Sequence, residues 1–206
     1  MSLIFSYVRS MLPFMIGAFP PILFFRMLRI RQLKRQGRNT TLRHELCLCL
    51  FLMFCAGLAS QTILPQLVLT ENGIQITGSC VEPYNLVPFR VIRNIWQSAL
   101  RHGHYGYLLV NIFGNILLFL PFGFFPALLW QRPRFLKSVG ITFLVSLTVE
   151  LCQIFQPRVS DIDDLILNVT GGMLGYGCFL LFRRHRPQVI PMYRVKSAGL
   201  MQISIT

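Results

Sequence analysis

The sequence predicts an all-α membrane protein, a bundle of about five transmembrane helices without a soluble domain. Hydrophobic residues make up 53% of its 206 residues and charged residues only 13%, a ratio that would leave a globular protein with a large apolar surface in water. Five apolar stretches reach the roughly 20 residues that cross a bilayer. The net charge of +13 is concentrated in blocks between these stretches. Such blocks are typical of membrane loops and argue against nucleic acid as a partner.

The expected spans are Leu3–Leu28, Leu46–Leu69, Gly106–Trp130, Lys137–Phe155 and Leu165–Phe182. The first contains Arg9 and the pair Pro20-Pro21, which is expected to kink it. With no small-residue cleavage site after it, this segment is interpreted as a retained helix rather than a signal peptide. We therefore expect an N-terminal helix with a basic loop over residues 1–45, a transmembrane domain over 46–186 and a cytoplasmic tail over 187–206.

The basic residues also predict the orientation of the bundle. Fifteen of the 20 lysines and arginines fall in three blocks, within 26–43, 132–137 and 183–196. Alternating spans place all three blocks on one side of the membrane, which by the positive-inside rule is the cytoplasm. The N-terminus is then outside, the C-terminus is cytoplasmic, and Thr70–Tyr105 forms an outer loop.

Polar residues within the last three spans are expected at one membrane depth. Asn111 and Asn115 are four apart near the outer end of the third span and share a helix face. Glu150 and Gln153 are three apart near the outer end of the fourth span. Polar residues inside a membrane are costly and usually have a function, so their convergence predicts a polar pocket near the outer face.

A short turn carrying Arg158 leads into the fifth span, where Asp161, Asp164 and Asn168 follow one stripe. Carboxylates before a first helical turn complement the helix dipole, so capping combined with pocket lining is favoured over a metal site. Arg158 would meet a phosphate or carboxylate of a ligand, or equally pair with Asp161 or Glu150.

Cysteines and histidines indicate no metal or cofactor. The six cysteines show no metal-ligand spacing, and five of them lie within apolar runs, where cysteine behaves as a small hydrophobic residue. No cofactor and no metal are expected. Membrane lipids are the expected partners, together with a lipid-linked or amphiphilic ligand.

Four motifs resemble the VanZ family, which is named for a protein associated with teicoplanin resistance. They are Asn85-Leu-Val-Pro88-Phe89, Asn111-Ile-Phe-Gly-Asn115 with Pro121-Phe-Gly123, Glu150-x-x-Gln153, and Arg158-x-x-Asp161-x-x-Asp164-x-x-x-Asn168-x-x-Gly171. The resemblance covers about Leu46–Phe182. It implies a multi-pass protein of the bacterial plasma membrane that contributes to resistance to teicoplanin or membrane-active antimicrobials.

The residues themselves leave three kinds of function open. In the first, Glu150, Asp161 and Asp164 act as acids, bases or orienting carboxylates, and the ligand is bound by Asn85, Asn111, Asn115, Gln153, Arg158 and Asn168. In the second, the chain is a membrane scaffold or binding protein without chemistry. The third, a transporter, is least favoured, because Leu117–Trp130 in the inner half of the third span has no ionisable residue.

Overall fold

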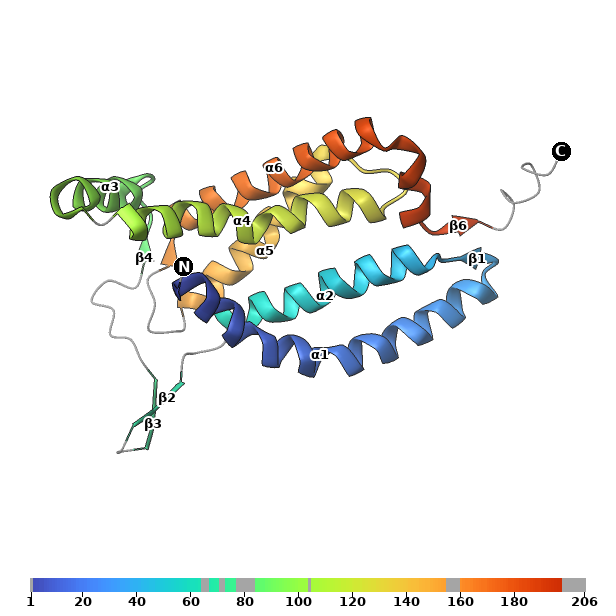
Figure 1. Cartoon of the computed structure of the whole chain (residues 1–206), viewed down its shortest axis with the longest axis horizontal. Helices are drawn as coiled ribbons and strands as arrows, with labels where there is room; N and C mark the ends of the chain where they lie inside the picture. The colour runs from blue at the N-terminus through green and yellow to red at the C-terminus, as the bar shows by residue number, and fades with distance from the viewer. Residues whose placement is uncertain are drawn as a thin grey trace. The chain divides into compact units, whose positions relative to one another are not determined.

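In the computed structural model of the chain, five helices are long and apolar enough to cross a membrane (Figure 1). The structure describes residues 2–63, 67–70, 73–76, 84–103, 105–154 and 160–197. The long helices are α1 (Ser2–Arg35), α2 (Leu42–Thr62), α4 (Tyr105–Leu129), α5 (Phe135–Ile154) and α6 (Ile162–His185). The predicted fold class, an all-α multi-pass membrane protein, is confirmed.

Short elements connect these helices. They are the helix α3 (Arg90–His102), the 3-10 helix η1 (Pro187–Tyr193), and the strands β1 (Arg38–Asn39), β2 (Leu67–Thr70), β3 (Gly73–Ile76), β4 (Tyr84–Asn85), β5 (Ser160–Asp161) and β6 (Lys196–Ser197). The strands form three two-stranded pairs, in which β1 and β6 are antiparallel, β2 and β3 are antiparallel, and β4 and β5 are parallel.

Several helix boundaries differ from those predicted from hydropathy. Helix α1 continues through Pro20 and Pro21 to Arg35, so its basic end belongs to the helix. Helix α2 begins at Leu42 and ends at Thr62, and the apolar residues Leu67–Leu69 lie in the hairpin strand β2 instead. Hydropathy counts apolar residues and does not detect where the helical backbone ends, which explains both differences.

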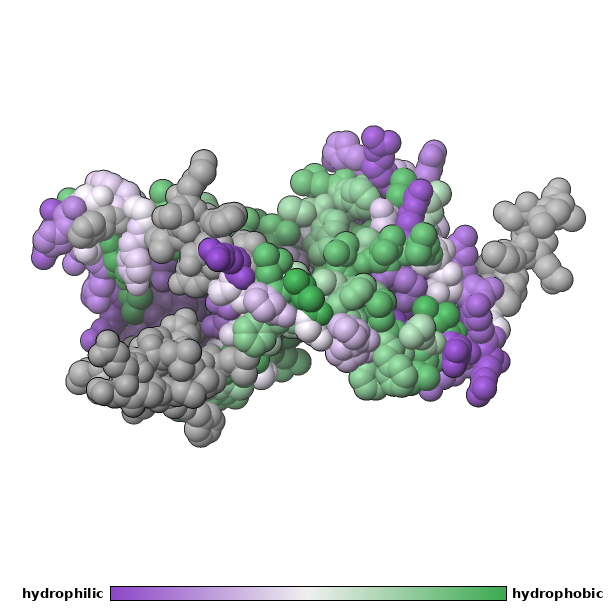
Figure 2. Space-filling view, turned by 60° about the horizontal axis from the view of Figure 1, so that its bottom comes forward, coloured by the Kyte–Doolittle hydropathy of each residue, from purple (hydrophilic) through white to green (hydrophobic). Residues whose placement is uncertain are grey.

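The chain divides into two compact units. Unit 1 comprises Met1–Gln61, Phe124–Arg134 and Gly177–Thr206, and unit 2 comprises Thr62–Gly123 and Phe135–Tyr176. Figure 2 shows hydrophobic residues over the sides of the long helices. It also shows hydrophilic residues at the α3 end of unit 2 and at the η1 end of unit 1.

In unit 1, α1 and α2 run side by side and are joined through β1 (Figure 1). Arg26 donates to both carboxylate oxygens of Glu45 at 2.9 Å, and both side chains are largely buried. Gly57 of α2 leaves room for Met15 of α1, because a Cβ at Gly57 would lie 2.9 Å from the Met15 Cγ. An ion pair near one end and a close approach near the other therefore fix α1 against α2.

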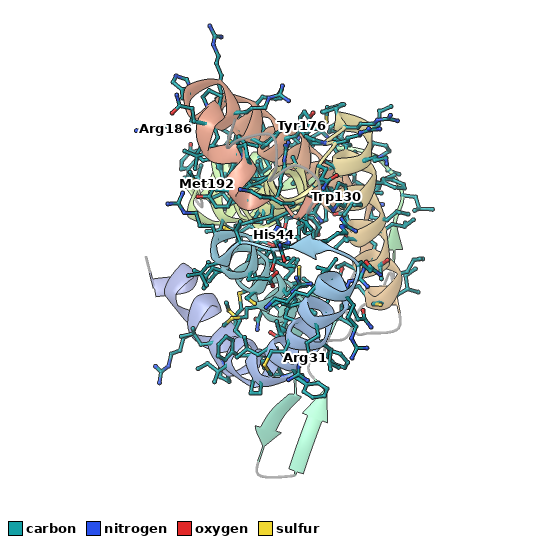
Figure 3. All side chains as sticks on the ribbon, turned by 90° about the vertical axis from the view of Figure 1, so that its right-hand side faces the viewer. Arg31, His44, Trp130, Tyr176, Arg186 and Met192 are labelled. Atoms are coloured by element: carbon teal, nitrogen blue, oxygen red, sulfur yellow. The ribbon has the colours of Figure 1, made fainter. Side chains whose placement is uncertain are left out.

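The segment after α6 folds onto the beginning of α2 in unit 1. Nδ1 of His44 donates to the carbonyl oxygen of Tyr193 at 2.7 Å, and the Thr41 hydroxyl donates to the carbonyl of Met192. Figure 3 views this end, with His44 and Met192 labelled. Residues 187–197, predicted as a cytoplasmic tail, therefore include a folded 3-10 helix and one strand of a pair.

In unit 2, glycines allow α4, α5 and α6 to approach closely. A Cβ on Gly123 of α4 would overlap the carbonyl oxygen of Gly172 in α6, and a Cβ on Gly171 would overlap the carbonyl oxygen of Ile116 in α4. A Cβ on Gly172 would overlap the side chain of Thr142 in α5. These small residues therefore serve packing, because they bring the backbones together as in other membrane bundles.

Helix α3 was not predicted and lies within the expected outer loop. It begins after Phe89, whose φ of 62° is left-handed, and ends at Gly103, whose φ of 72° closes the helix with an N–H bond to the Ala99 carbonyl. Glycine takes this conformation without a Cβ penalty. For Phe89 the same conformation costs about 1–2 kcal/mol, so contacts from elsewhere must hold it.

Candidate functional site

The polar cluster of unit 2 begins with a strand pair that joins two distant loops. Strands β4 and β5 pair in parallel, with Asn85 opposite Asp161. The Asn85 Nδ2 donates to Asp161 Oδ1 at 3.0 Å, and the Asn85 Oδ1 accepts from the Val87 N–H at 3.3 Å. Both side chains are buried. The Asn85 side chain therefore stabilises a turn in its own loop, as asparagine commonly does. It also connects that loop to Asp161, which precedes α6.

Asp163, in the first turn of α6, caps helix α3. Its Oδ1 accepts from the Phe89 N–H, and its Oδ2 accepts from the Val91 and Ile92 N–H groups at 2.9 and 3.1 Å. The side chain is fully buried. The first N–H groups of a helix have no partner within that helix, and here a carboxylate from another helix supplies one. These bonds also hold Phe89 in its left-handed conformation.

Glu150, near the end of α5, bonds to strand β5 of this pair. Its Oε2 accepts from the backbone N–H of Asp161 at 2.9 Å. Asp161 Oδ1 in turn accepts from the N–H of Asp163 at 3.0 Å, in addition to the Asn85 amide. Glu150, Asp161 and Asp163 are thus linked by hydrogen bonds through one backbone segment.

Asp164 is the carboxylate of the cluster that faces α4. Nδ2 of Asn115 donates to its Oδ1 at 2.6 Å. The side chain is half-buried, and the carboxylates of Glu150, Asp161 and Asp163 all act on it electrostatically. Several like charges in one place repel one another, so this end of unit 2 favours a cation or hydrogen-bond donors.

Asn168 lies one helical turn deeper than Asp164. Its Nδ2 donates to the Ser146 hydroxyl of α5 at 2.9 Å, and the side chain is only 3% exposed. Within the part of the chain that the structure describes, its Oδ1 is buried and accepts no hydrogen bond. An unsatisfied buried acceptor is costly, so this oxygen is a place where a donor would be stabilised.

The hydrogen bonds of the cluster named above do not involve three other predicted site residues. Gln153 lies on α5, where its Nε2 approaches the Thr62 carbonyl at 3.5 Å. Asn111 is half-buried on α4. The bond from α4 to Asp164 comes from Asn115. Arg158 lies outside the described residues.

Asp163 and Ser146 belong to the cluster but were not selected from the sequence. Asp163 falls between the members of the stripe that begins at Asp161, and its partners are backbone groups more than 70 residues away. Ser146 belongs to a series of residues four apart on α5, comprising Ser138, Thr142, Ser146 and Glu150, all of them buried. That spacing was the signal that could have identified it.

The surroundings of Asp161 alter its acidity. Burial raises the pKa of its carboxyl above the ordinary value. The hydrogen bonds from the Asp163 N–H and the Asn85 amide oppose this rise, and the neighbouring Asp163 carboxylate adds to it. Within the described ranges, no group of three or more histidine, cysteine, aspartate or glutamate side chains is arranged to hold a metal ion.

The helices and this cluster define a polytopic membrane protein with an acidic, amide-lined site at one end of its last three spans. The VanZ/LLP1 family model matches residues 45–183, and the chain belongs to this family. Protein VanZ of Enterococcus faecium is 35% identical over 75 residues, which are 36% of this chain and 47% of that protein. The match thus spans about half the length of that relative. No solved structure matches the chain.

Proposed function

We propose that the chain is a cell-envelope protein of the bacterial plasma membrane that contributes to resistance to teicoplanin or membrane-active antimicrobials. In this proposal it binds an amphiphilic ligand through the acidic cluster of unit 2. Family membership supports the class of function. The observation that carries the proposal is that α4 and α5 both bond to the start of α6, through Asn115 to Asp164 and through Glu150 to the N–H of Asp161.

The members of the cluster divide by how fully the fold already uses them. Asp161 and Asp163 accept hydrogen bonds that shape the loops, so their main role is positioning. Asp164 accepts one amide bond and is half-buried. Asp164, with the open oxygen of Asn168 one turn deeper, is therefore the part that receives the ligand, and Glu150 adjoins it through the Asp161 backbone.

The chemistry of these groups specifies the part of the ligand that binds. Ionised carboxylates and an amide oxygen accept hydrogen bonds and attract positive charge. The ligand accordingly presents a donor-rich headgroup, with hydroxyl or amine groups, while its acyl or isoprenoid part stays in lipid. Glu150 or Asp164 would act as general base on such a hydroxyl if the ligand is modified rather than only bound.

The orientation forms part of the proposal. The distribution of the three basic blocks along the sequence supports a location of the acidic cluster at the outer face, by the positive-inside rule. A reporter fused after the last residue, active only in the cytoplasm, should be active. Activity of a periplasmic reporter at the same position would show that the opposite orientation is correct.

Conservative substitutions test the site without removing its hydrogen bonds. Glu150→Gln retains an acceptor for the Asp161 N–H, and Asp164→Asn retains an acceptor for Asn115, while each removes a charge. Thr148→Val is a matched control, because this α5 residue is exposed and its hydroxyl donates to the Leu144 carbonyl of its own helix. The readout is growth under teicoplanin of cells that lack the chromosomal copy.

The expected outcome is that both charge-removing variants reach wild-type levels in the membrane and lose protection, whereas Thr148→Val protects fully. If both carboxylate variants protect like the wild type at equal levels, the ligand site is wrong. The cluster would then be structural, as expected for the alternative of a scaffold protein without chemistry.

A further inference from the structure

Helix α3 separates polar from apolar residues along its length. Arg93, Gln97 and Arg101 follow one another at four-residue intervals and are all exposed. Ile92, Trp96 and Leu100 form the neighbouring stripe. Residues four apart lie on the same side of a helix, so α3 has a basic stripe beside an apolar one.

The apolar stripe of α3 is only partly covered by the protein. Ala99, on the side facing unit 2, is 1% exposed, whereas Trp96 and Leu100 are 55% and 59% exposed. A tryptophan and a leucine next to arginines on a short amphipathic helix are typical of helices that lie in the membrane interface. Contact with lipid would remove this exposed apolar surface from water.

Aromatic residues around α3 indicate the depth at which it lies. Phe89, before the helix, and Tyr105 and Tyr107, in the first turn of α4, are each at least half exposed. Tyrosine and tryptophan are enriched where hydrocarbon meets headgroups. With Trp96, these residues gather exposed aromatic side chains before and on α3 and on the start of α4.

We propose that α3 lies in the bilayer interface, with Trp96 and Leu100 in lipid and with Arg93 and Arg101 binding the phosphate groups of anionic phospholipids. Charge complementarity identifies the lipid. The two guanidinium groups stand eight residues apart, which is about 12 Å along a helix, and each presents a planar fork suited to phosphate. The cap from Asp163 fixes the helix to α6, so that lipid bound by α3 adjoins the acidic cluster.

The test uses the full-length chain in proteoliposomes, with Trp130→Phe leaving Trp96 as the single tryptophan among the two in the sequence. Brominated phosphatidylglycerol and brominated phosphatidylcholine quench tryptophan on contact. The ratio of the two quenching strengths therefore gives the relative association constant of phosphatidylglycerol at the protein surface around Trp96. Circular dichroism confirms that each variant is folded, and Trp130→Tyr serves as a second background.

With both arginines present, the fluorescence of Trp96 should be quenched by both lipids and more strongly by phosphatidylglycerol. Arg93→Gln and Arg101→Gln should each lower the relative association constant for phosphatidylglycerol about fivefold, since a basic residue near an anionic surface contributes about 1 kcal/mol. Gln97→Ala, between them on the same stripe, should leave the constant unchanged.

Two results would overturn the proposal. Absence of quenching by either lipid would mean that the apolar stripe of α3 does not face lipid. Equal quenching of Trp96 by the two lipids in the Trp130→Phe protein with both arginines intact would mean that the arginines do not select phosphate headgroups by charge. Neither outcome depends on antimicrobial resistance, so this test and the test of the acidic cluster can fail independently.

Discussion

Asp163 holds the backbone of Phe89, a residue 74 positions earlier in the chain. With the bonds to Val91 and Ile92, this single carboxylate fixes the first turn of α3 from the first turn of α6. Phe89 and Asp163 belong to two sequence motifs, Asn85–Phe89 and Arg158–Asn168. The bond between them shows that the two motifs form one structural joint. Asn85 and Asp161 form its second contact.

Removing the carboxylate of Asp163 should release α3. In Asp163→Ala, three backbone N–H groups lose their acceptor, and each buried donor left without one costs about 1–3 kcal/mol. Trypsin should then cleave at the arginines of α3 faster than in the wild type. The control Asp164→Asn keeps its bond to Asn115 and should be cleaved at the wild-type rate. Equal rates for Asp163→Ala and the wild type would show that the cap does not stabilise α3.

Stability should depend on the protonation of Asp161. Its pKa is raised in the folded protein because burial disfavours the charged carboxylate. The contribution of this group is therefore fully present below the ordinary value of 3.8 and is lost as the pH rises through the higher folded value. Asp161→Asn retains the acceptor oxygen for Asn85 and cannot ionise, so it resembles the protonated wild type.

The difference in unfolding midpoint between wild type and Asp161→Asn isolates this group from the other carboxyls. Measured in detergent from about pH 3 to about pH 7, the wild-type midpoint should fall relative to that of the variant. A difference that is constant across this range would mean that burial does not raise the pKa of Asp161.

Two glycines of α6 should respond oppositely to the same substitution. Gly172→Ala places a methyl group against Thr142, and such overpacking costs about 1–3 kcal/mol. A Cβ at Gly177 has no neighbour within 4 Å, so Gly177→Ala should stabilise the helix by up to about 1 kcal/mol. Thermal unfolding of the two variants measures the contrast. A similar change in both would contradict the close approach of α5 and α6.

The ion pair between α1 and α2 should show coupling. Glu45→Gln or Arg26→Gln alone leaves a largely buried charge without its partner, whereas the double variant Arg26→Gln with Glu45→Gln removes both charges. We expect a coupling energy of about 0.5–3 kcal/mol in a double-mutant cycle of unfolding. Additive effects of the two single substitutions would show that the pair contributes nothing measurable to the packing of α1.

The transmembrane helices could be predicted because the bilayer requires about 20 apolar residues from each span. The hydrogen bond between Asn115 and Asp164 agrees with the expectation that the polar residues of the last three spans lie at one membrane depth. Depth does not specify the direction in which a side chain points, however. Gln153 was assigned to the cluster by its spacing from Glu150, but on α5 it points to the Thr62 carbonyl.

Helix α3 had a signal in the sequence that hydropathy does not detect. Val91, Ile92, Ile95, Trp96, Ala99 and Leu100 recur at helical spacing, and Gly103 follows as a stop. The role of Asp163 had no such signal, because a carboxylate that binds backbone N–H groups leaves no complementary side chain to recognise. Its partners could be found only once the fold had brought Phe89 beside α6.

The long-range cap also orders events during synthesis. The ribosome makes Phe89 and its neighbours well before Asp163, and at about 5–20 residues per second the interval of 74 residues lasts about 4–15 s. During that time α4 and α5 are made, and the amide groups at the start of α3 must rely on water. The bonds that fix the first turn of α3 therefore cannot form until α6 emerges.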